Sequence, residues 1–123
     1  MKKLYKLITI NLFPVNINIK PQKKVIMTEA LYNEFTKEIH TANEKSVKLG
    51  YYPSRFLQMA EQSGSVQAAK KMVTSGAIPN GMKKLKKMRK LDLTIESIMI
   101  KEKYQSLFTV EELNAAKWRL NSV

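Results

Sequence analysis

The chain has 123 residues, which is enough for one domain with a modest hydrophobic core. Because it contains no cysteine, a disulfide, a thiolate nucleophile and a cysteine-ligated metal site are excluded, and the composition fits a reducing, cytoplasmic location. The formal net charge of +12 favours a polyanionic partner, either nucleic acid, an anionic membrane or an acidic protein surface; the alternative is a basic surface without such a partner.

Residues 1–27 have the composition of a basic, flexible N-terminal extension, because six lysines and no acid precede Glu29. The apolar run that begins at Leu7 is interrupted by Asn11 and stopped by Pro14, so it is too short to span a membrane. No small-residue cleavage site follows it, as a secretory signal would require.

The rest of this extension carries two weaker signals. Residues 15–19 alternate with period two and favour a short strand, but the sequence offers no partner strand. Met27 suits the start of a small helical protein, so we hypothesise that residues 1–26 are not translated in the cell. We therefore expect the folded domain to cover residues 28–123.

The first expected helix runs from Glu29 to Leu49. Thr28 can cap its start and Gly50 its end, because a threonine hydroxyl accepts from a free first-turn N–H and glycine adopts the left-handed conformation of a C-cap. His40 is the only histidine of the chain and has no local partner for a zinc site, so we expect it at the surface. One face of the helix carries the apolar residues Leu31, Phe35, Ile39, Ala42 and Leu49.

Two short helices are expected next, over residues 54–62 and 65–74. Ala60 and Gly64 have the spacing of the small residue and the turn glycine in a helix-turn-helix motif. Lys70 departs from that motif, since an apolar side chain usually occupies its position. The two helices are therefore expected either to read DNA or to be a plain packed pair.

A lysine-rich helix is expected from Met82 to Leu91, with an apolar stripe and no acid before Asp92. Like charges on successive turns oppose such a helix in isolation by a few tenths of a kcal/mol per pair, and a polyanion along the exposed face would remove that cost. The alternative is a solvated lysine face. The candidate nucleic-acid-binding residues are Lys83, Lys84, Lys86, Lys87, Arg89 and Lys90, with Lys70 and Lys71 as additions.

Two capped helices complete the chain. Thr94 is expected to cap a helix over residues 95–101, with an acid in its first turn. Thr109 and Glu112 have the spacing of a capping box, in which each side chain accepts from the backbone N–H of the other residue. This box predicts the start of the last helix, over residues 110–120.

The last helix is expected to bury one face. Leu113, Ala116 and Leu120 form its apolar stripe at helical spacing. Trp118 lies off this stripe, and we expect it to cover the base of the core. The alternative is an exposed platform for a base or a partner.

Three segments, together with several single residues between them, carry a resemblance to a small helical module of bacteria and phages. The segments are residues 52–59, 89–96 and 107–113, which read YPSRFLQM, RKLDLTIE and LFTVEEL. The module occurs as a stand-alone protein and as a segment of longer ones, and the resemblance covers about residues 28–120. It implies a helical fold and a bacterial or phage source, and it implies no catalytic residues.

These observations predict an all-α fold: a compact orthogonal bundle of five to six short helices with a flexible N-terminal extension. No catalytic motif, phosphate-binding glycine loop or cluster of metal ligands occurs, so we expect neither an enzyme nor a cofactor. We expect a binding module that contacts nucleic-acid phosphates with little sequence specificity. The alternative is an accessory module that docks on an acidic protein surface.

Overall fold

The computed structural model describes residues 19–76, 78 and 80–123, and it describes side chains from Thr28 onward within those ranges. Every regular element in this part of the chain is a helix, which confirms the expected all-α class. The elements in chain order are α2 (Ile19–Lys48), α3 (Ser54–Ser63), α4 (Ser65–Val73), α5 (Asn80–Lys87), the 3-10 helix η1 (Leu91–Leu93), α6 (Ile95–Met99), the 3-10 helix η2 (Glu102–Leu107) and α7 (Val110–Ser122).

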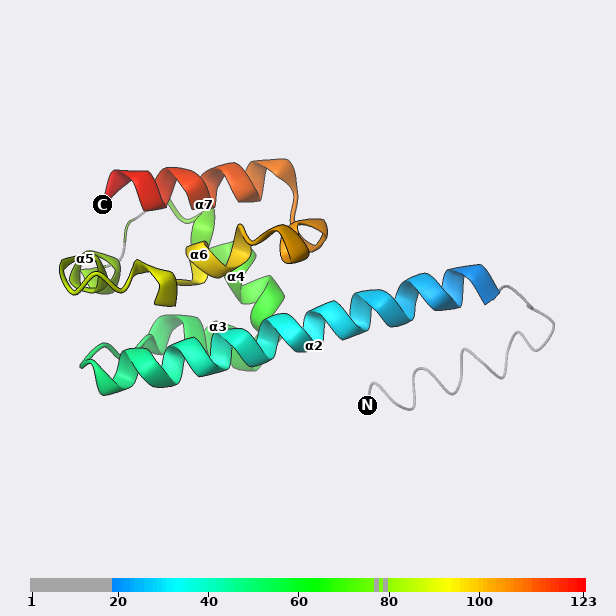
Figure 1. The fold of residues 1–123 in the computed structure, drawn as a ribbon, viewed down its shortest axis with the longest axis horizontal. Helices are drawn as coiled ribbons and strands as arrows, with labels where there is room; N and C mark the ends of the chain where they lie inside the picture. The colour runs from blue at the N-terminus through cyan, green and yellow to red at the C-terminus, as the bar shows by residue number, and fades with distance from the viewer. Residues whose placement is uncertain (1–18, 77, 79) are drawn as a thin grey trace.

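Two helices, α2 and α7, form the outer layers of the bundle (Figure 1). The long helix α2 runs along one side of the molecule and α7 along the opposite side, with α4 and α6 between them. The short helix α5 lies at the end of the molecule where α2 finishes and where the chain reaches its C-terminus. The lysine-rich segment is therefore at one end of the bundle and not in its middle.

The core is built around α4 and the middle of α2. Ala68 and Ala69 are fully buried, and their small side chains let neighbouring helices approach α4 closely. Phe35 of α2 contacts two aromatic rings edge-on, with centroid distances of 5.2 Å to Tyr104 and 5.4 Å to Phe108. These edge-to-face contacts join α2 to the segment that leads into α7.

Helix α2 begins earlier than expected, at Ile19 instead of Glu29. Thr28 therefore lies within the helix and is not its N-cap. The only helix breaker in the added stretch is Pro21, and a proline in a first turn removes an N–H that has no intrahelical partner there. Of the strand considered over residues 15–19, only Ile19 is described, and it is helical; residues 1–18 of the expected extension lie outside the described part.

The end of α2 is the expected glycine C-cap. Gly50 has a φ of +94°, which a residue with a Cβ adopts at a cost. The Gly50 N–H donates to the carbonyl of Val47 at 2.9 Å, and the Tyr51 N–H donates to that of Ser46 at 2.9 Å. This pair of bonds is the Schellman motif, and it satisfies carbonyls that the end of a helix otherwise leaves free.

Helix α5 begins at Asn80 and ends at Lys87, whereas the sequence predicted residues 82–91. It ends early because Arg89 adopts the left-handed conformation, with a φ of +59°. The Arg89 N–H donates to Lys86 at 2.9 Å and the Lys90 N–H donates to Leu85 at 2.8 Å, which again is a Schellman motif. Here an arginine occupies the position that glycine prefers.

Both caps predicted for the C-terminal half are confirmed. The Thr94 hydroxyl accepts from the Ser97 N–H at 3.1 Å at the start of α6. At the start of α7 the Thr109 hydroxyl accepts from the Glu112 N–H at 3.1 Å, while Glu112 accepts from the Thr109 N–H at 2.9 Å. The expectation for Trp118 is wrong: its side chain is 56% exposed, because the core face of α7 turns away from it.

Candidate nucleic-acid interface

The cations of the lysine-rich segment all point outward. Met82 and Leu85 are 3% and 1% exposed, so they fix α5 against the bundle and leave the other faces of the helix to solvent. We call the exposed set the cationic face. It consists of Lys83, Lys84, Lys86, Lys87, Arg89 and Lys90.

Two residues of the cationic face contact backbone carbonyls. Lys84 Nζ donates to the carbonyl of Gly50 at 3.2 Å, which places a positive charge at the C-terminal end of α2. Lys86 Nζ donates to the backbone oxygen of Val123. Within the described residues, no Asp or Glu side chain forms an ion pair with any member of the cationic face.

Several carboxylates are instead paired in other parts of the bundle. Glu96 pairs with Arg119 inside the core, and Glu112 lies 3.9 Å from Lys70. Glu34 and Glu38 pair with lysines of the segment around η2. These four carboxylates are therefore not available to neutralise the cationic face.

Two further lysines, which the sequence analysis did not single out, extend this charge. Lys45 and Lys48 of the last turn of α2 line a cavity of about 280 Å³ together with Lys90 and Asp92. Lysines are common in the last turn of a helix because they interact favourably with the helix dipole. The presence of Lys45 and Lys48 at the end of α2 therefore did not indicate a binding site in the sequence. The fold brings them next to the end of the cationic face.

The two other candidate cations lie apart on α4. Lys70 is half-buried beside Glu112, so an acid within the fold already balances its charge. Lys71 is exposed.

The arrangement of α4 does not favour the helix-turn-helix alternative. A recognition helix must present one face to a DNA groove. In α4 the residues Val66, Ala68, Ala69, Met72 and Val73 are buried, while Gln67 and Lys71 leave one face open, so the burial of α4 alone does not exclude the motif. The turn before α4 fits it poorly. A single residue, Gly64, separates α3 from α4, and its φ of +89° makes the turn tighter than the three or four residues usual in the motif.

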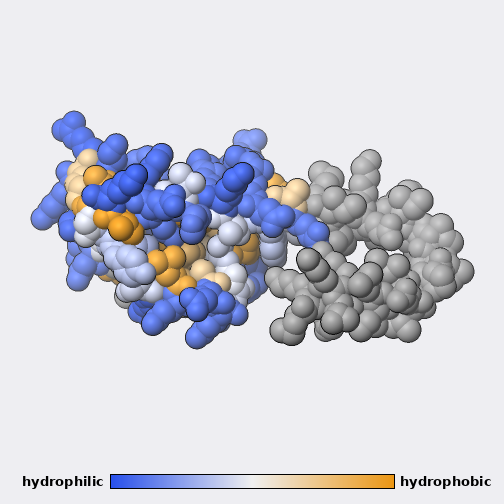
Figure 2. All heavy atoms as spheres, turned by 90° about the horizontal axis from the view of Figure 1, so that it is seen from below, coloured by the Kyte–Doolittle hydropathy of each residue, from blue (hydrophilic) through white to orange (hydrophobic). Residues whose placement is uncertain are grey.

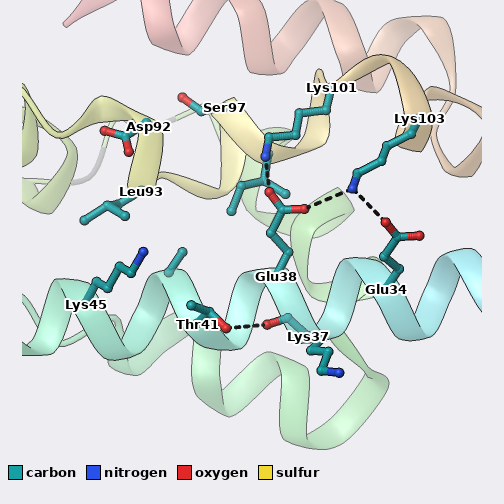
Figure 3. Close-up of a pocket in the computed structure, with 12 residues that line it drawn as sticks. Glu34, Lys37, Glu38, Thr41, Lys45, Asp92, Leu93, Ser97, Lys101 and Lys103 are labelled. Atoms are coloured by element: carbon teal, nitrogen blue, oxygen red, sulfur yellow. Dashed lines mark hydrogen bonds and ion pairs between the residues drawn. The ribbon is translucent and has the colours of Figure 1, made fainter.

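A second surface feature is a groove of about 760 Å³ between α2 and the segment from η1 to η2 (Figure 3). Glu34 and Glu38 reach across it from α2, and Lys101 and Lys103 meet them from the other side. Lys103 Nζ lies 2.7 Å from Glu34 Oε2 and 3.8 Å from Glu38 Oε1. These ion pairs close one end of the groove.

Glu38 has the most strongly held carboxylate of this groove. The Tyr104 hydroxyl donates to its Oε1 at 2.7 Å, and Lys101 donates to its Oε2. Burial acts to raise the pKa of Glu38, but the hydrogen bonds from Lys101 and Tyr104 and the nearby lysine charges outweigh burial and lower it. Burial and the bond to Glu38 raise the pKa of Tyr104 to about 12.

The groove has the features of a structural contact. Glu34 and Glu38 accept bonds from lysines and a tyrosine, so these two are ion-paired carboxylates and not free general bases. In the described residues, no group of three or more acidic or histidine side chains is arranged to hold a metal ion. His40 is exposed on α2, as expected, with its Nε2 4.0 Å from a carboxylate oxygen of Glu44.

The underside of the molecule provides no stronger candidate. Figure 2 shows the underside of the molecule, where hydrophilic residues dominate and the apolar patches are small and scattered. An extended docking face would need a larger contiguous apolar patch than this side shows. Among the helices of residues 19–123, none combines the length and the apolar character needed to cross a membrane.

Comparisons with protein-family models, with curated proteins and with solved structures found no significant match. The function is therefore argued from the geometry and charge described above.

Proposed function

We propose that this protein is a non-enzymatic module that binds nucleic acid through backbone phosphates, with little sequence specificity. The observation that carries the proposal is the cationic face on α5. Its charges lie at one end of the molecule, without an Asp or Glu partner among the described residues.

The spacing of these charges suits a polyanion better than a single acidic group. Lys83, Lys87 and Lys90 succeed one another along α5 and the turn that follows it, and Lys45 and Lys48 continue the charge across the end of α2. A phosphate backbone presents charges at regular short intervals, and lysines contact it without reading bases. Binding would also relieve the mutual repulsion of lysines on one short helix.

The test is binding of the full chain to a labelled generic duplex and single strand, measured by fluorescence anisotropy at about 50 mM salt. The site variant is Lys83→Gln, Lys87→Gln and Lys90→Gln combined. Its matched control is Lys37→Gln, Lys103→Gln and Lys117→Gln, which removes the same charge at exposed lysines of α2, η2 and α7. The site variant is expected to lose affinity by about tenfold or more, and the control by much less.

Two outcomes would assign the function elsewhere. If changing Lys2, Lys3, Lys6, Lys20, Lys23 and Lys24 to Gln removed binding while the site variant kept it, the basic N-terminal residues and not α5 would be responsible. If neither nucleic acid bound at low salt, and a protein partner captured from lysate survived nuclease treatment, the alternative of docking on an acidic protein surface would replace the proposal.

A further inference from the structure

A cleft of about 250 Å³ lies on the bundle beside the starts of α3 and α5, apart from the cationic face. Residues from the first turns of both helices line it, together with side chains of α4, α7 and the turn after α2. The polar members of its wall are Tyr51, Tyr52, Ser54, Arg55, Ser75, Asn80 and Arg119.

Arg119 lines this cleft, and only one of the three nitrogens of its guanidinium has a hydrogen-bond partner. Its side chain is 1% exposed, and its Nε–H donates to Glu96 Oε2 at 2.7 Å. The two terminal nitrogens, Nη1 and Nη2, are buried and have no hydrogen-bond partner in the described part of the protein. Glu96 is not among the residues that line the cleft, and its bond to Nε leaves both terminal nitrogens without an acceptor.

An unpaired buried guanidinium nitrogen is costly. Leaving a buried donor without an acceptor costs the full desolvation of that donor, and the cost is larger for a charged group. Most buried polar groups in proteins therefore have a partner. An acceptor supplied by a ligand would remove this cost.

The start of α3 adds free donors to the same cleft. Pro53 is the N-cap and provides no side-chain hydrogen bond, and the first helical bond of α3 runs from the Leu57 N–H to the Pro53 carbonyl at 3.0 Å. The N–H groups of Arg55 and Phe56 precede that bond, so they have no carbonyl partner within the helix. The start of α5, at Asn80 and Gly81, lines the cleft as well.

We propose that this cleft binds a phosphate group, held by the terminal nitrogens of Arg119 and by the free N–H groups at the start of α3. An arginine fork and a helix start both match the multiple acceptor oxygens and negative charge of a phosphate. Because both nitrogens are shielded from solvent, the phosphate must displace part of the cleft wall to reach them. This site does not depend on the cationic face.

The test is an NMR titration of the ¹⁵N-labelled full chain with inorganic phosphate, at ionic strength held constant with chloride. The reporters are the backbone N–H signals of Arg55 and Phe56 and the side-chain Nε–H signal of Arg119. The Nε–H of Arg89, on the cationic face, is the internal control. We expect saturable shifts at the three reporters with a dissociation constant of about 1 mM or lower.

A substitution that preserves the fold distinguishes a loss of phosphate binding from a loss of stability. Ser54→Asp places a carboxylate at the first position of α3, where it suits the helix dipole but repels a phosphate in the cleft. Ser65→Asp makes the same change at the first position of α4, which does not line the cleft. Ser54→Asp is expected to weaken phosphate binding by about tenfold or more, and Ser65→Asp to leave it unchanged.

The source of the phosphate is distinguished by a 5′-phosphorylated oligonucleotide and its 5′-hydroxyl counterpart. If the phosphorylated strand alone shifts the Arg119 signal, at lower concentration than inorganic phosphate does, the cleft holds a nucleic-acid end. If the two strands act alike while inorganic phosphate shifts the reporters, it holds free phosphate. The absence of saturable shifts at Arg119 and Arg55, or identical shifts in Ser54→Asp, overturns the proposal, and neither result bears on duplex binding by the cationic face.

Discussion

Arg119 Nε lies 2.7 Å from Glu96 Oε2, and this bond joins α7 to α6 through a buried ion pair. The two side chains are 1% and 6% exposed. Taking two charges out of water is costly, and the pair is tolerated because each charge compensates the other. The bond therefore makes each partner depend on the other for its place in the core.

Removing one partner should be far worse than removing both. We expect Glu96→Ala to lower the free energy of unfolding by about 3–5 kcal/mol, because it leaves the guanidinium buried without a counter-charge. The double variant Glu96→Leu with Arg119→Met should recover most of that loss, since apolar side chains of similar volume can replace a buried pair. Urea unfolding monitored by circular dichroism measures both, and a loss of less than about 1 kcal/mol in Glu96→Ala would contradict the structural importance of the pair.

The left-handed conformation of Arg89 predicts a stabilising substitution. A residue with a Cβ pays about 1 kcal/mol or more at a φ of +59°, and glycine does not. Arg89→Gly should therefore raise the free energy of unfolding by about 1 kcal/mol relative to Arg89→Ala, which removes the same charge but keeps the strain. The two variants are compared by urea unfolding. Equal stability would mean that the turn after α5 is not left-handed at this position.

The lowered pKa of Glu38 predicts how the free energy of unfolding depends on pH. Its pKa in the folded protein lies below the ordinary value of 4.5, so the stability it contributes is fully present above that pH and is lost as the pH falls through the lowered pKa. Glu38→Gln should be less stable than the wild type at neutral pH, and the difference should shrink as the pH falls below 4.5.

Thermal unfolding between neutral pH and about pH 3 measures this dependence, across the range in which carboxylates titrate. Glu61→Gln is the control, because Glu61 is exposed on α3 and has no ion pair within the described residues. It should keep the wild-type acid dependence. A constant difference between Glu38→Gln and the wild type at every pH would rule out the assigned role of the Glu38 charge.

Local rules were enough to predict most of the helix boundaries. The capping box of Thr109 and Glu112 and the glycine cap at Gly50 depend only on residues within one turn, so the sequence contains all the information they need. The start of α2 was missed because Thr28 is a good cap that the longer helix does not use. The end of α5 was missed because arginine is an unusual residue at a left-handed position.

Contacts between distant residues could not be predicted. Glu96 and Arg119 are 23 positions apart, and each looks like an ordinary surface charge in its own helix. One local sign was available. Arg119 follows Ala116 by three positions, so both side chains lie on the same face of α7, and Ala116 is fully buried in the core. Gly81 is a further case: a Cβ there would lie 2.0 Å from the Tyr51 ring, and only the folded chain brings the two together.

The candidate site was predicted in part. The outward direction of the lysines on α5 followed from the apolar spacing of Met82 and Leu85. Their lack of Asp or Glu partners, and the addition of Lys45 and Lys48, follow from the tertiary fold alone. Exposure of a charge is a local property, whereas its neutralisation depends on residues from elsewhere in the chain.

The most direct test of the central claim is the salt dependence of duplex binding. The logarithm of the binding constant should fall linearly with the logarithm of salt concentration, by about 0.9 for each phosphate contacted. Combining Lys83→Gln, Lys87→Gln and Lys90→Gln should reduce this slope by up to about 2.7, while the control at Lys37, Lys103 and Lys117 should leave it unchanged. Equal slopes for the two variants, or binding that does not respond to salt, would contradict phosphate contact through the cationic face.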